Sequence, residues 1–581
     1  MAKKSDPEYD EYGCRKVQQA DAGEEDSKKP SQSDILLGIV NECQLFHDEL
    51  KEPYVKFKVH NHVEVWPVRS TLFKRWLVGQ FYYLTGRGCN SDAINQALNV
   101  AEAKSLFDGI MIKLSLRCAE CEGIFWYDLA NDLWEAVKIS PDGWEIMKSP
   151  ILFRRFANTA EQVKPSRNGD IHLLRKFVNL KNDNEFNLLA VYLVSCLIPD
   201  VPKIIVPLSG EKGASKSTML RILRRLIDPA AKELLTMPHD QKELPLTLYK
   251  NYMPAFDNLS NLNEWQSDVL CCAATGGGIS KRKLYTDDDE VILSFLRCVT
   301  LNGINTVATK PDLLDRSIPF ELERIDGDHR QTERQFWKAF EEVRPLILGG
   351  MFDILVRAMT IYPTVKLDKL PRMADFCQWG YAIAESMGEW SGDEFLMAYY
   401  RNIGRANDEA IRNSPVANAV IIFMNSRAVW NGSAADLLKE LGNVAFRERI
   451  DTNSKTWPRS AVALAKRLKH YKSNFADAGI MYKSEYNSKS NSNHIYFQKV
   501  VNYTQNTQCA QKTQENQGVI SLGTSLGIET NNCIPSRIPS VPSDVPSGTK
   551  PDSIRAYGNT GNTGNNSPTF GETKYYEGTI E

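Results

Sequence analysis

The alternation of hydrophobic and polar residues along the chain predicts a mixed α/β protein. Near the N-terminus, the segment DILLGIVNECQLF has a helical period, and YVKFKV and VEVWPV alternate as strands do. Two amphipathic helices are predicted next, from STLFKRWLVGQFYYLTG and SDAINQALNVAEAKSLF. Residues 170–200 have a helical pattern, and residues 203–325 alternate apolar strands with helices. Residues 330–405 are again helical, and residues 415–500 form a small basic α/β unit.

Polar segments stand at both ends of this region. Residues 1–32 carry mixed charges, and the stretch from about residue 501 to the end is rich in Asn, Thr, Gly, Ser and Pro. Neither segment contains enough apolar surface to order itself, so we expect an arm and a tail without fixed structure. The folded part of the chain is therefore expected between them.

The strongest chemical signal is a loop between a predicted strand and a predicted helix. Residues 203–218 read KIIVPLSGEKGASKST, and MLRILRRLI follows. Backbone N–H groups of such a loop and of the helix N-terminus converge on a phosphate anion. The pattern G-x-x-x-x-G-K-[ST] is met by Gly210, Lys216 and Ser217, but Ser215 replaces the last glycine and lacks its backbone freedom.

In this interpretation Lys216 reaches the β- and γ-phosphates of ATP, and the Ser217 hydroxyl ligates Mg²⁺. The alternative is a chance loop rich in Gly, Ser and Lys, which the flanking strand and helix disfavour. The residues predicted to bind ATP are Gly210, Glu211, Lys212, Gly213, Ala214, Ser215, Lys216, Ser217 and Thr218.

Polar residues also follow two later apolar strands. Asp257 ends the segment YMPAFD, where it would hold Mg²⁺ through water. Asn258 occupies the position where many ATPases carry a glutamate that polarises the attacking water. Asn302 ends RCVTLN and could position water near the γ-phosphate. Taken alone, Asp257 reads equally well as a helix N-cap and Asn302 as a turn residue.

An arginine follows the third strand, in the segment TKPDLLDRSIPF. Arg316 cannot easily fold back to its own nucleotide, but it could reach the γ-phosphate of a neighbouring subunit as an arginine finger. The alternative is a surface arginine paired with Asp312 or Asp315.

With these residues in place, the chain resembles ATP-binding proteins encoded by phages, plasmids and integrative elements. These are related to the superfamily 3 and poxvirus/phage-type primase–helicases and have an AAA+-like core. The resemblance covers roughly residues 33–485. It rests on SGEKGASKST, AFDNLS, ATGGGISKRKLYTDDDEVILSF, LNGINTVATKPDLLDRSIPF and LPRMADF.

The resemblance implies an ATPase that assembles as a homo-oligomeric ring, such as a hexamer, and translocates on nucleic acid. It also implies that Ser215 is tolerated before the loop lysine, and it leads us to expect an arginine where this chain has Lys310. Ring helicases of this kind present a DNA-contacting hairpin to the pore, and the basic turn Lys281, Arg282 and Lys283 stands between the ATPase strands. A solvated charge run, balanced by the acidic residues 287–290, is the alternative.

The C-terminal unit has a second concentration of basic charge. Ser433 and Asp436 have the spacing of a helix cap, and a second helix is predicted over Pro458–Lys472. Val462, Leu464 and Leu468 would form its apolar side. This pattern resembles a winged helix whose second helix contacts DNA phosphates, and the alternative is a basic solvated helix. The residues predicted to contact DNA here are Arg459, Lys466, Arg467, Lys469 and Lys472.

Composition narrows the class of protein. The 581 residues carry a formal net charge of −2, which excludes a wholly basic DNA packager but permits local basic faces. No apolar run approaches the length of a membrane span, no signal peptide is evident, and the 12 cysteines are thinly spread. These features favour a cytoplasmic protein without a membrane partner.

The fold expected is α/β, with a P-loop core of the AAA+ or superfamily 3 type. The expected parts are a disordered arm (1–32), an N-terminal α/β domain (33–165), a helical connector (166–200), the ATPase core (201–325), a helical domain (326–410), a winged-helix-like domain (411–500) and a disordered tail (501–581).

The expected function is Mg²⁺-dependent ATP hydrolysis coupled to DNA unwinding during replication of a mobile element. The alternative is an ATP-switched initiator or loader that binds DNA without unwinding it. A P-loop kinase for a small metabolite is weaker, because it has no use for the basic segments.

Overall fold

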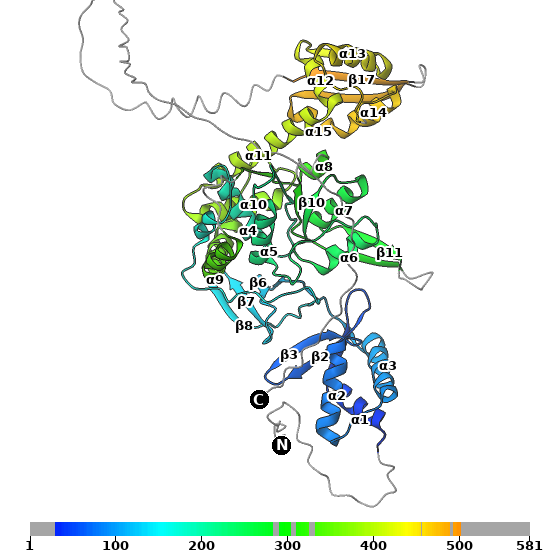
Figure 1. Ribbon diagram of the computed structural model, residues 1–581, viewed down its shortest axis with the longest axis vertical. Helices are drawn as coiled ribbons and strands as arrows, with labels where there is room; N and C mark the ends of the chain where they lie inside the picture. The colour runs from blue at the N-terminus through cyan, green and yellow to red at the C-terminus, as the bar shows by residue number, and fades with distance from the viewer. Residues whose placement is uncertain are drawn as a thin grey trace, which may run out of the picture. The chain divides into compact units, whose positions relative to one another are not determined.

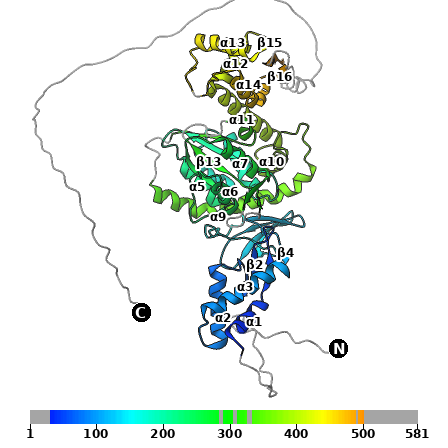
Figure 2. The same ribbon diagram turned by 90° about the vertical axis from the view of Figure 1, so that its right-hand side faces the viewer.

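The computed structural model describes residues 30–282, 290–303, 310–324, 332–454, 456–487 and 492–500. They belong to one compact unit, Met1–Tyr503. Figures 1 and 2 show this unit in two views.

The first part of the chain is a small sheet covered by three helices. Its strands lie in the order β3-β2-β1-β4, and the helices bury Leu36, Phe73 and Ala97 against it. The expected helix at the N-terminus is shorter than predicted, because QLFH forms a strand that pairs antiparallel with β2. The elements are α1 (Gln32–Asn41), β1 (Gln44–His47), β2 (Pro53–Val59), β3 (His62–Pro67), α2 (Thr71–Thr85), α3 (Ser91–Phe107) and β4 (Ile110–Met111).

A second, antiparallel sheet follows and belongs to the main core. Tyr127, Val137 and Trp144 from this sheet share one hydrophobic cluster with the central sheet and its helices. The boundary expected at residue 165 therefore does not separate two cores, because the sheet buries one face against α9 (Figures 1 and 2). Its strands are β5 (Cys118–Cys121), β6 (Ile124–Asp128), β7 (Glu135–Ser140) and β8 (Gly143–Lys148).

The central sheet is parallel and has the strand order β10-β13-β9-β14. A parallel sheet needs crossover connections, and here they are mostly helical. Its strands are β9 (Val206–Gly210), β10 (Ala255–Leu259), β13 (Thr300–Gly303) and β14 (Phe320–Leu322). The intervening elements are α5 (Lys216–Ile227), α6 (Glu243–Lys250), α7 (Glu264–Thr275), the antiparallel strands β11 (Gly278–Arg282) and β12 (Glu290–Ser294), and α8 (Pro311–Leu314).

Helices before and after the central sheet complete the main core. They are η1 (Ile171–Lys176), α4 (Asp183–Ser195), α9 (Glu333–Ile361), η3 (Tyr362–Thr364), α10 (Ala374–Met387) and α11 (Gly392–Asn413). The segment 166–171 crosses α9 beside Pro345, where the Ser166 N–H donates to the Pro345 carbonyl at 2.9 Å. A Cβ on Gly349 would lie 1.8 Å from the Ser166 carbonyl oxygen, so only glycine permits this crossing.

The helix from Glu333 to Thr364 is the one segment of the described residues that is long and apolar enough to cross a membrane. This differs from the sequence-based expectation that no run approaches that length. More than half of its most apolar window (56%) is buried inside the molecule, where it contacts α10, η1 and the β5–β8 sheet. A helix that is buried in a protein core can be equally apolar, so the packing of this helix explains its apolar composition.

The C-terminal unit has its own core around Phe423, Leu437 and Phe497. Its sheet has the order β15-β17-β16, and Asn407 of α11 is joined to Asn474 and Asp477 of α15 by hydrogen bonds of 2.9 and 2.6 Å. The elements are α12 (Pro415–Asn425), β15 (Val429–Ser433), α13 (Ala434–Arg447), α14 (Ala461–His470), α15 (Lys472–Asp477), β16 (Ile480–Asn487) and β17 (Ser492–Lys499).

A buried carboxylate joins the segment before β5 to the end of α5. Asp228 lies 3.0 Å from Arg117 and 3.4 Å from Arg224, and it accepts backbone N–H groups from Tyr252 and Met253. Burial alone would raise the pKa of Asp228, but the two arginines hold it below its ordinary 3.8. The ionised carboxylate is therefore the form that the folded chain stabilises.

Replacing Asp228 with asparagine is expected to destabilise the fold by about 3–5 kcal/mol, because two buried guanidinium groups lose their carboxylate. Chemical unfolding measures the effect. The control is Asp183→Asn, whose carboxylate is 83% exposed beside Arg175 and should cost less than about 1 kcal/mol. Since the folded pKa is lowered, this contribution is present above pH 3.8 and is lost as the pH falls through the folded pKa. Equal losses in the two variants would contradict this account.

Candidate functional site

The loop after β9 has backbone conformations that favour glycine. Gly210 has φ 141° and Gly213 has φ 86°. A Cβ on Gly210 would lie 2.5 Å from the carbonyl oxygen of Leu322 on the neighbouring strand. Ser215 also lies in the left-handed region, with φ 58°, which costs a non-glycine residue about 1–2 kcal/mol. Ser215 therefore adopts the backbone conformation that a glycine would take at this position, at the cost of local strain.

The first turn of α5 begins directly after this loop. Its N-cap residue, Ser215, makes no side-chain cap, so the first N–H groups of α5 receive no bond from it. In the loop, Glu211, Lys212 and Gly213 are exposed and Ala214 is buried, while Thr218 is half-buried in the helix. The helix N-terminus therefore has backbone donors available to an anion.

Lys216 folds back across the loop. Its Nζ donates to the carbonyl oxygens of Gly210 at 2.7 Å and Glu211 at 2.9 Å. Partial burial lowers the pKa of Lys216, and the nearby Asp257 carboxylate opposes that shift. The ammonium group thus binds the loop carbonyls and is close enough to the Asp257 carboxylate for the two charges to interact.

Three polar side chains meet beside this lysine. The Ser217 hydroxyl lies 2.9 Å from one oxygen of Asp257 and 3.1 Å from the other. The Asn302 amide donates to Asp257 and, at 3.3 Å, to the Ser217 hydroxyl. Asn302 is buried and its Oδ1 has no partner among the described residues. The hydroxyl, carboxylate and amide oxygens form a set of hard ligands suited to Mg²⁺.

The topology explains why these side chains meet. Strand β13 lies between β9 and β10, and all three strands are parallel. The carboxyl ends of the strands therefore share one edge, where a ligand site is expected in an open α/β sheet. The sequence identified Ser217 by the loop pattern and Asp257 and Asn302 by their places after apolar segments. The direct bond between Asn302 and Asp257 was missed, because the strand order is not visible in the sequence.

Two of the predicted site residues lie outside this cluster. Asn258 is exposed, has φ 59°, and belongs to an irregular step in the pairing of β10 with β13. Arg316 forms an ion pair of 2.7 Å with Asp312, and its side chain is 16% exposed. Arg372 contacts the same Asp312 and lies 3.0 Å from Asp315. Within a single chain, Arg316 therefore makes the ion pair with Asp312 that the sequence analysis gave as the alternative to an arginine finger.

The basic residues predicted to contact DNA are only partly described. Lys281 and Arg282 belong to β11, which pairs with β12 in a register that sets Arg282 opposite Glu290. Lys283 lies outside the described residues. Lys310 is described, and its Nζ lies 3.7 Å from Glu264 and 3.9 Å from Asp268.

In the C-terminal unit, the basic helix differs from its predicted form. Ser460 caps it, so it begins at Ala461 and not at Pro458. Its buried side chains are Leu464, Ala465 and Leu468. Val462, expected on the apolar side, is 74% exposed, because two helical positions separate residues by about 200°.

The five predicted DNA-contacting residues of this unit fall into two groups. Arg459 donates to the Asn453 carbonyl at 3.3 Å, and Arg467 donates to the Thr456 carbonyl. Lys466, Lys469 and Lys472 are exposed and make no ion pair among the described residues. Three of the five are therefore available to a partner.

Two family models match the chain. Residues 171–402 match the actinomycete integrative conjugative element replication protein, and residues 416–512 match the AICE RepA C-terminal domain. Together they span more than half of the 581 residues. No curated protein matches the chain.

Solved structures give only distant likenesses. An apo structure of the NrS-1 C terminal region is 10% identical with a TM-score of 0.37, over 81% of this chain and 100% of that one. Another structure of that region is 12% identical with a TM-score of 0.35. A JCV helicase bound to a small molecule is 15% identical, with a TM-score of 0.19, over 39% of this chain and 66% of that one. Scores this low do not establish a common overall fold.

Proposed function

We propose that this chain, which belongs to the replication proteins of actinomycete integrative conjugative elements over residues 171–402 and 416–512, is an Mg²⁺-dependent ATPase that drives DNA unwinding. The observation that carries the proposal is the meeting of Lys216, Ser217, Asp257 and Asn302 beside the N-terminus of α5. Together these residues provide backbone donors, a cation and hard oxygen ligands at the carboxyl end of the parallel sheet.

The residues present fit a bound Mg-ATP. The Oδ1 of buried Asn302 has no partner in the described part of the chain and leaves an acceptor at the edge of the cluster, and the Ser217–Asp257 pair offers oxygen ligands. Ser217 and Asp257 would hold Mg²⁺, which supplies a Lewis acid for the phosphate oxygens. Lys216 would exchange its two loop carbonyls for the β- and γ-phosphates.

The roles of the remaining residues follow from their chemistry. The Asn302 amide would orient water near the γ-phosphate, since its Nδ2 and Oδ1 can donate and accept. Arg316 would act on the nucleotide of a neighbouring subunit after leaving Asp312, which requires a homo-oligomer such as a ring hexamer. Hydrolysis would then depend on assembly.

DNA contacts are proposed at two places. Lys281 and Arg282 of β11 would contact the phosphate backbone, together with Lys283, which lies outside the described residues. In the C-terminal unit, the element order helix, strand, three helices and two strands supports a winged-helix-like domain. There Lys466, Lys469 and Lys472 would contact phosphates, while Arg459 and Arg467 bind backbone carbonyls of their own unit.

One observation favours a second candidate, an ATP-switched initiator or loader without unwinding activity. Asn258 is exposed beside Asp257, and an amide cannot act as the base that polarises water. Such a protein would bind ATP and DNA but would hydrolyse slowly.

A strand-displacement assay on forked DNA separates the two candidates. It is combined with ATPase measurements with and without single-stranded DNA, and with sizing of the assembly. The helicase proposal expects DNA-stimulated hydrolysis and displaced strands from the same oligomer. DNA binding and hydrolysis without displaced strands would instead support the loader.

A further inference from the structure

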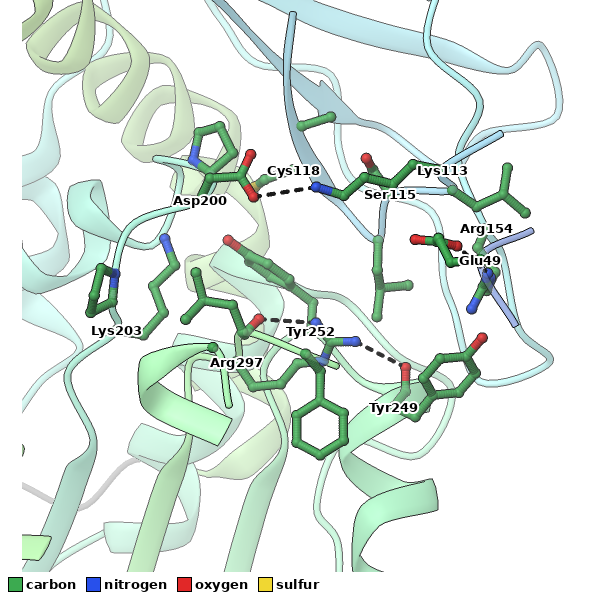
Figure 3. Close-up of a pocket in the computed structure, with 18 of the residues that line it drawn as sticks. Glu49, Lys113, Ser115, Cys118, Arg154, Asp200, Lys203, Tyr249, Tyr252 and Arg297 are labelled. Carbon is green, nitrogen blue, oxygen red and sulfur yellow. Dashed lines mark hydrogen bonds and ion pairs between the residues drawn. The ribbon is translucent and has the colours of Figure 1, made fainter. Parts of the chain in front are cut away.

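A cavity of about 480 Å³ lies at the opposite edge of the central sheet from the candidate nucleotide site. Lys203, Tyr252 and Arg297 line it, and each stands just before the amino end of β9, β10 or β13. Tyr252 and Arg297 each precede a site residue, Asp257 or Asn302, by five positions, which is about 16 Å along an extended strand. Figure 3 shows the residues around the cavity, with Tyr252 between the Lys113–Asp200 pair and Arg297.

One buried cation of this cavity, Arg297, has no carboxylate partner among the described residues. Arg297 is 8% exposed, and its guanidinium donates to the carbonyl oxygens of Leu248, Leu296 and Tyr249 at 2.7, 2.9 and 3.2 Å. Those bonds use three of its five N–H donors. Burial lowers the pKa of Arg297 to about 10, and the positive charge of Arg154 adds to the shift. An anion that enters the cavity would offset both the desolvation of the Arg297 charge and its repulsion by Arg154.

Other cations surround the same space, while the acids of the lining stand at its rim. Lys203 is 3% exposed and donates to the backbone carbonyls of Ser195 and Ile198. Lys113 pairs with Asp200 at 3.6 Å, while Arg154 already pairs with the buried Asp48 at 2.6 Å and lies 3.6 Å from Glu49. The carboxylates of Asp200 and Glu49 are 65% and 41% exposed, so water already solvates them. Lys203 and Arg297 are therefore the buried cations of the lining that have only carbonyl partners among the described residues.

We propose that this cavity binds a phosphate group carried by a nucleotide or by a DNA strand. A phosphate offers several acceptors to the unused Arg297 donors, and charge-assisted bonds of this kind are the strong ones. The volume exceeds the need of phosphate alone and falls within the range of small-molecule sites. Tyr249, whose ring lies 4.8 Å from the Arg154 guanidinium, provides an aromatic surface beside the cations.

The cavity is separate from the candidate nucleotide site, so the binding test is designed to exclude binding at that second site. Binding of labelled dAMP is measured by equilibrium dialysis with the full-length chain carrying Lys216→Ala, so that the candidate nucleotide site does not contribute. Inorganic phosphate and single-stranded oligothymidylate serve as competitors. Lys113→Glu is added to this background, because Lys113 is 68% exposed and its replacement should leave the fold intact.

Lys164→Glu is the matched control. Lys164 is 58% exposed and lies 3.1 Å from Glu135, a similar surface pair that does not line the cavity. We expect dAMP binding that phosphate competes for and that Lys113→Glu weakens by about tenfold, the loss of one charge-assisted bond. Lys164→Glu should leave the affinity unchanged. Arg297→Gln should remove binding, with a thermal melt to verify folding.

The competitors identify the source of the phosphate. If oligothymidylate displaces dAMP, and if Lys113→Glu weakens this competition, the cavity is assigned to a DNA strand. Binding of dAMP that oligothymidylate does not displace assigns it to a free nucleotide. Absent dAMP binding, or equal affinity in the Lys113→Glu and Lys164→Glu chains, would overturn the proposal.

Discussion

Replacing Lys216 with alanine is expected to lower ATP hydrolysis by the full-length chain at least about 100-fold, the loss typical for one charge-stabilising donor. Lys216 is the one ammonium group placed between the loop carbonyls and the Asp257 carboxylate within the described site. Without it, the charge that develops on the transferred phosphate loses the ammonium group that lies close to Asp257. Phosphate release, measured with and without single-stranded DNA, gives the result.

Lys250→Ala is the control for this experiment. Lys250 is an exposed lysine at the end of α6 and makes no ion pair among the described residues, so its removal should leave turnover unchanged. Nucleotide binding to the Lys216→Ala chain should weaken as well. Turnover at the unsubstituted rate in Lys216→Ala would refute the assignment of ATP hydrolysis to this loop.

Arg316→Ala is expected to abolish hydrolysis as strongly while nucleotide binding is retained. The side chain makes its ion pair with Asp312 and has a buried Nε without a partner among the described residues. A residue that acts on a neighbouring subunit is needed in the transition state and not for binding. Nucleotide binding and phosphate release are measured on the same preparation.

The matched control is Arg372→Ala, since Arg372 contacts the same Asp312 and is 44% exposed. Its loss should leave hydrolysis near the unsubstituted rate. Mixing the Arg316→Ala and Lys216→Ala chains should restore part of the activity, because an intact Lys216 then faces an intact Arg316 of another subunit. Mixed assemblies that stay inactive would argue against action between subunits.

The sequence predicted those features that depend on neighbouring residues. The loop glycines, the position of Asn302 near the end of β13, and the Ser433 cap of α13 all follow from local patterns, and the structure has them. Asp257 was expected to end its strand, but β10 continues to Leu259. The strand QLFH within a helical pattern was missed, because its pairing with β2 depends on a partner strand. The assignment of Val462 to a buried face was wrong because the helical phase was misjudged.

Long-range contacts could not be predicted from one sequence. Arg117 and Asp228 are more than 100 positions apart, and no local pattern relates them. The same holds for the β5–β8 sheet, whose alternating strands indicate a half-buried sheet but not which helix covers it. The cavity around Arg297 is likewise formed by segments from distant parts of the chain.

The crossing of α9 by the segment 166–171 limits where the chain can be divided. The family match begins at residue 171, but a fragment starting there would lack the backbone that lies against Gly349 and Pro345. It would also lack Arg117, and Asp228 would keep only one of its two arginines. The smallest fragment that preserves this packing therefore begins before Arg117, well upstream of the region that the family defines.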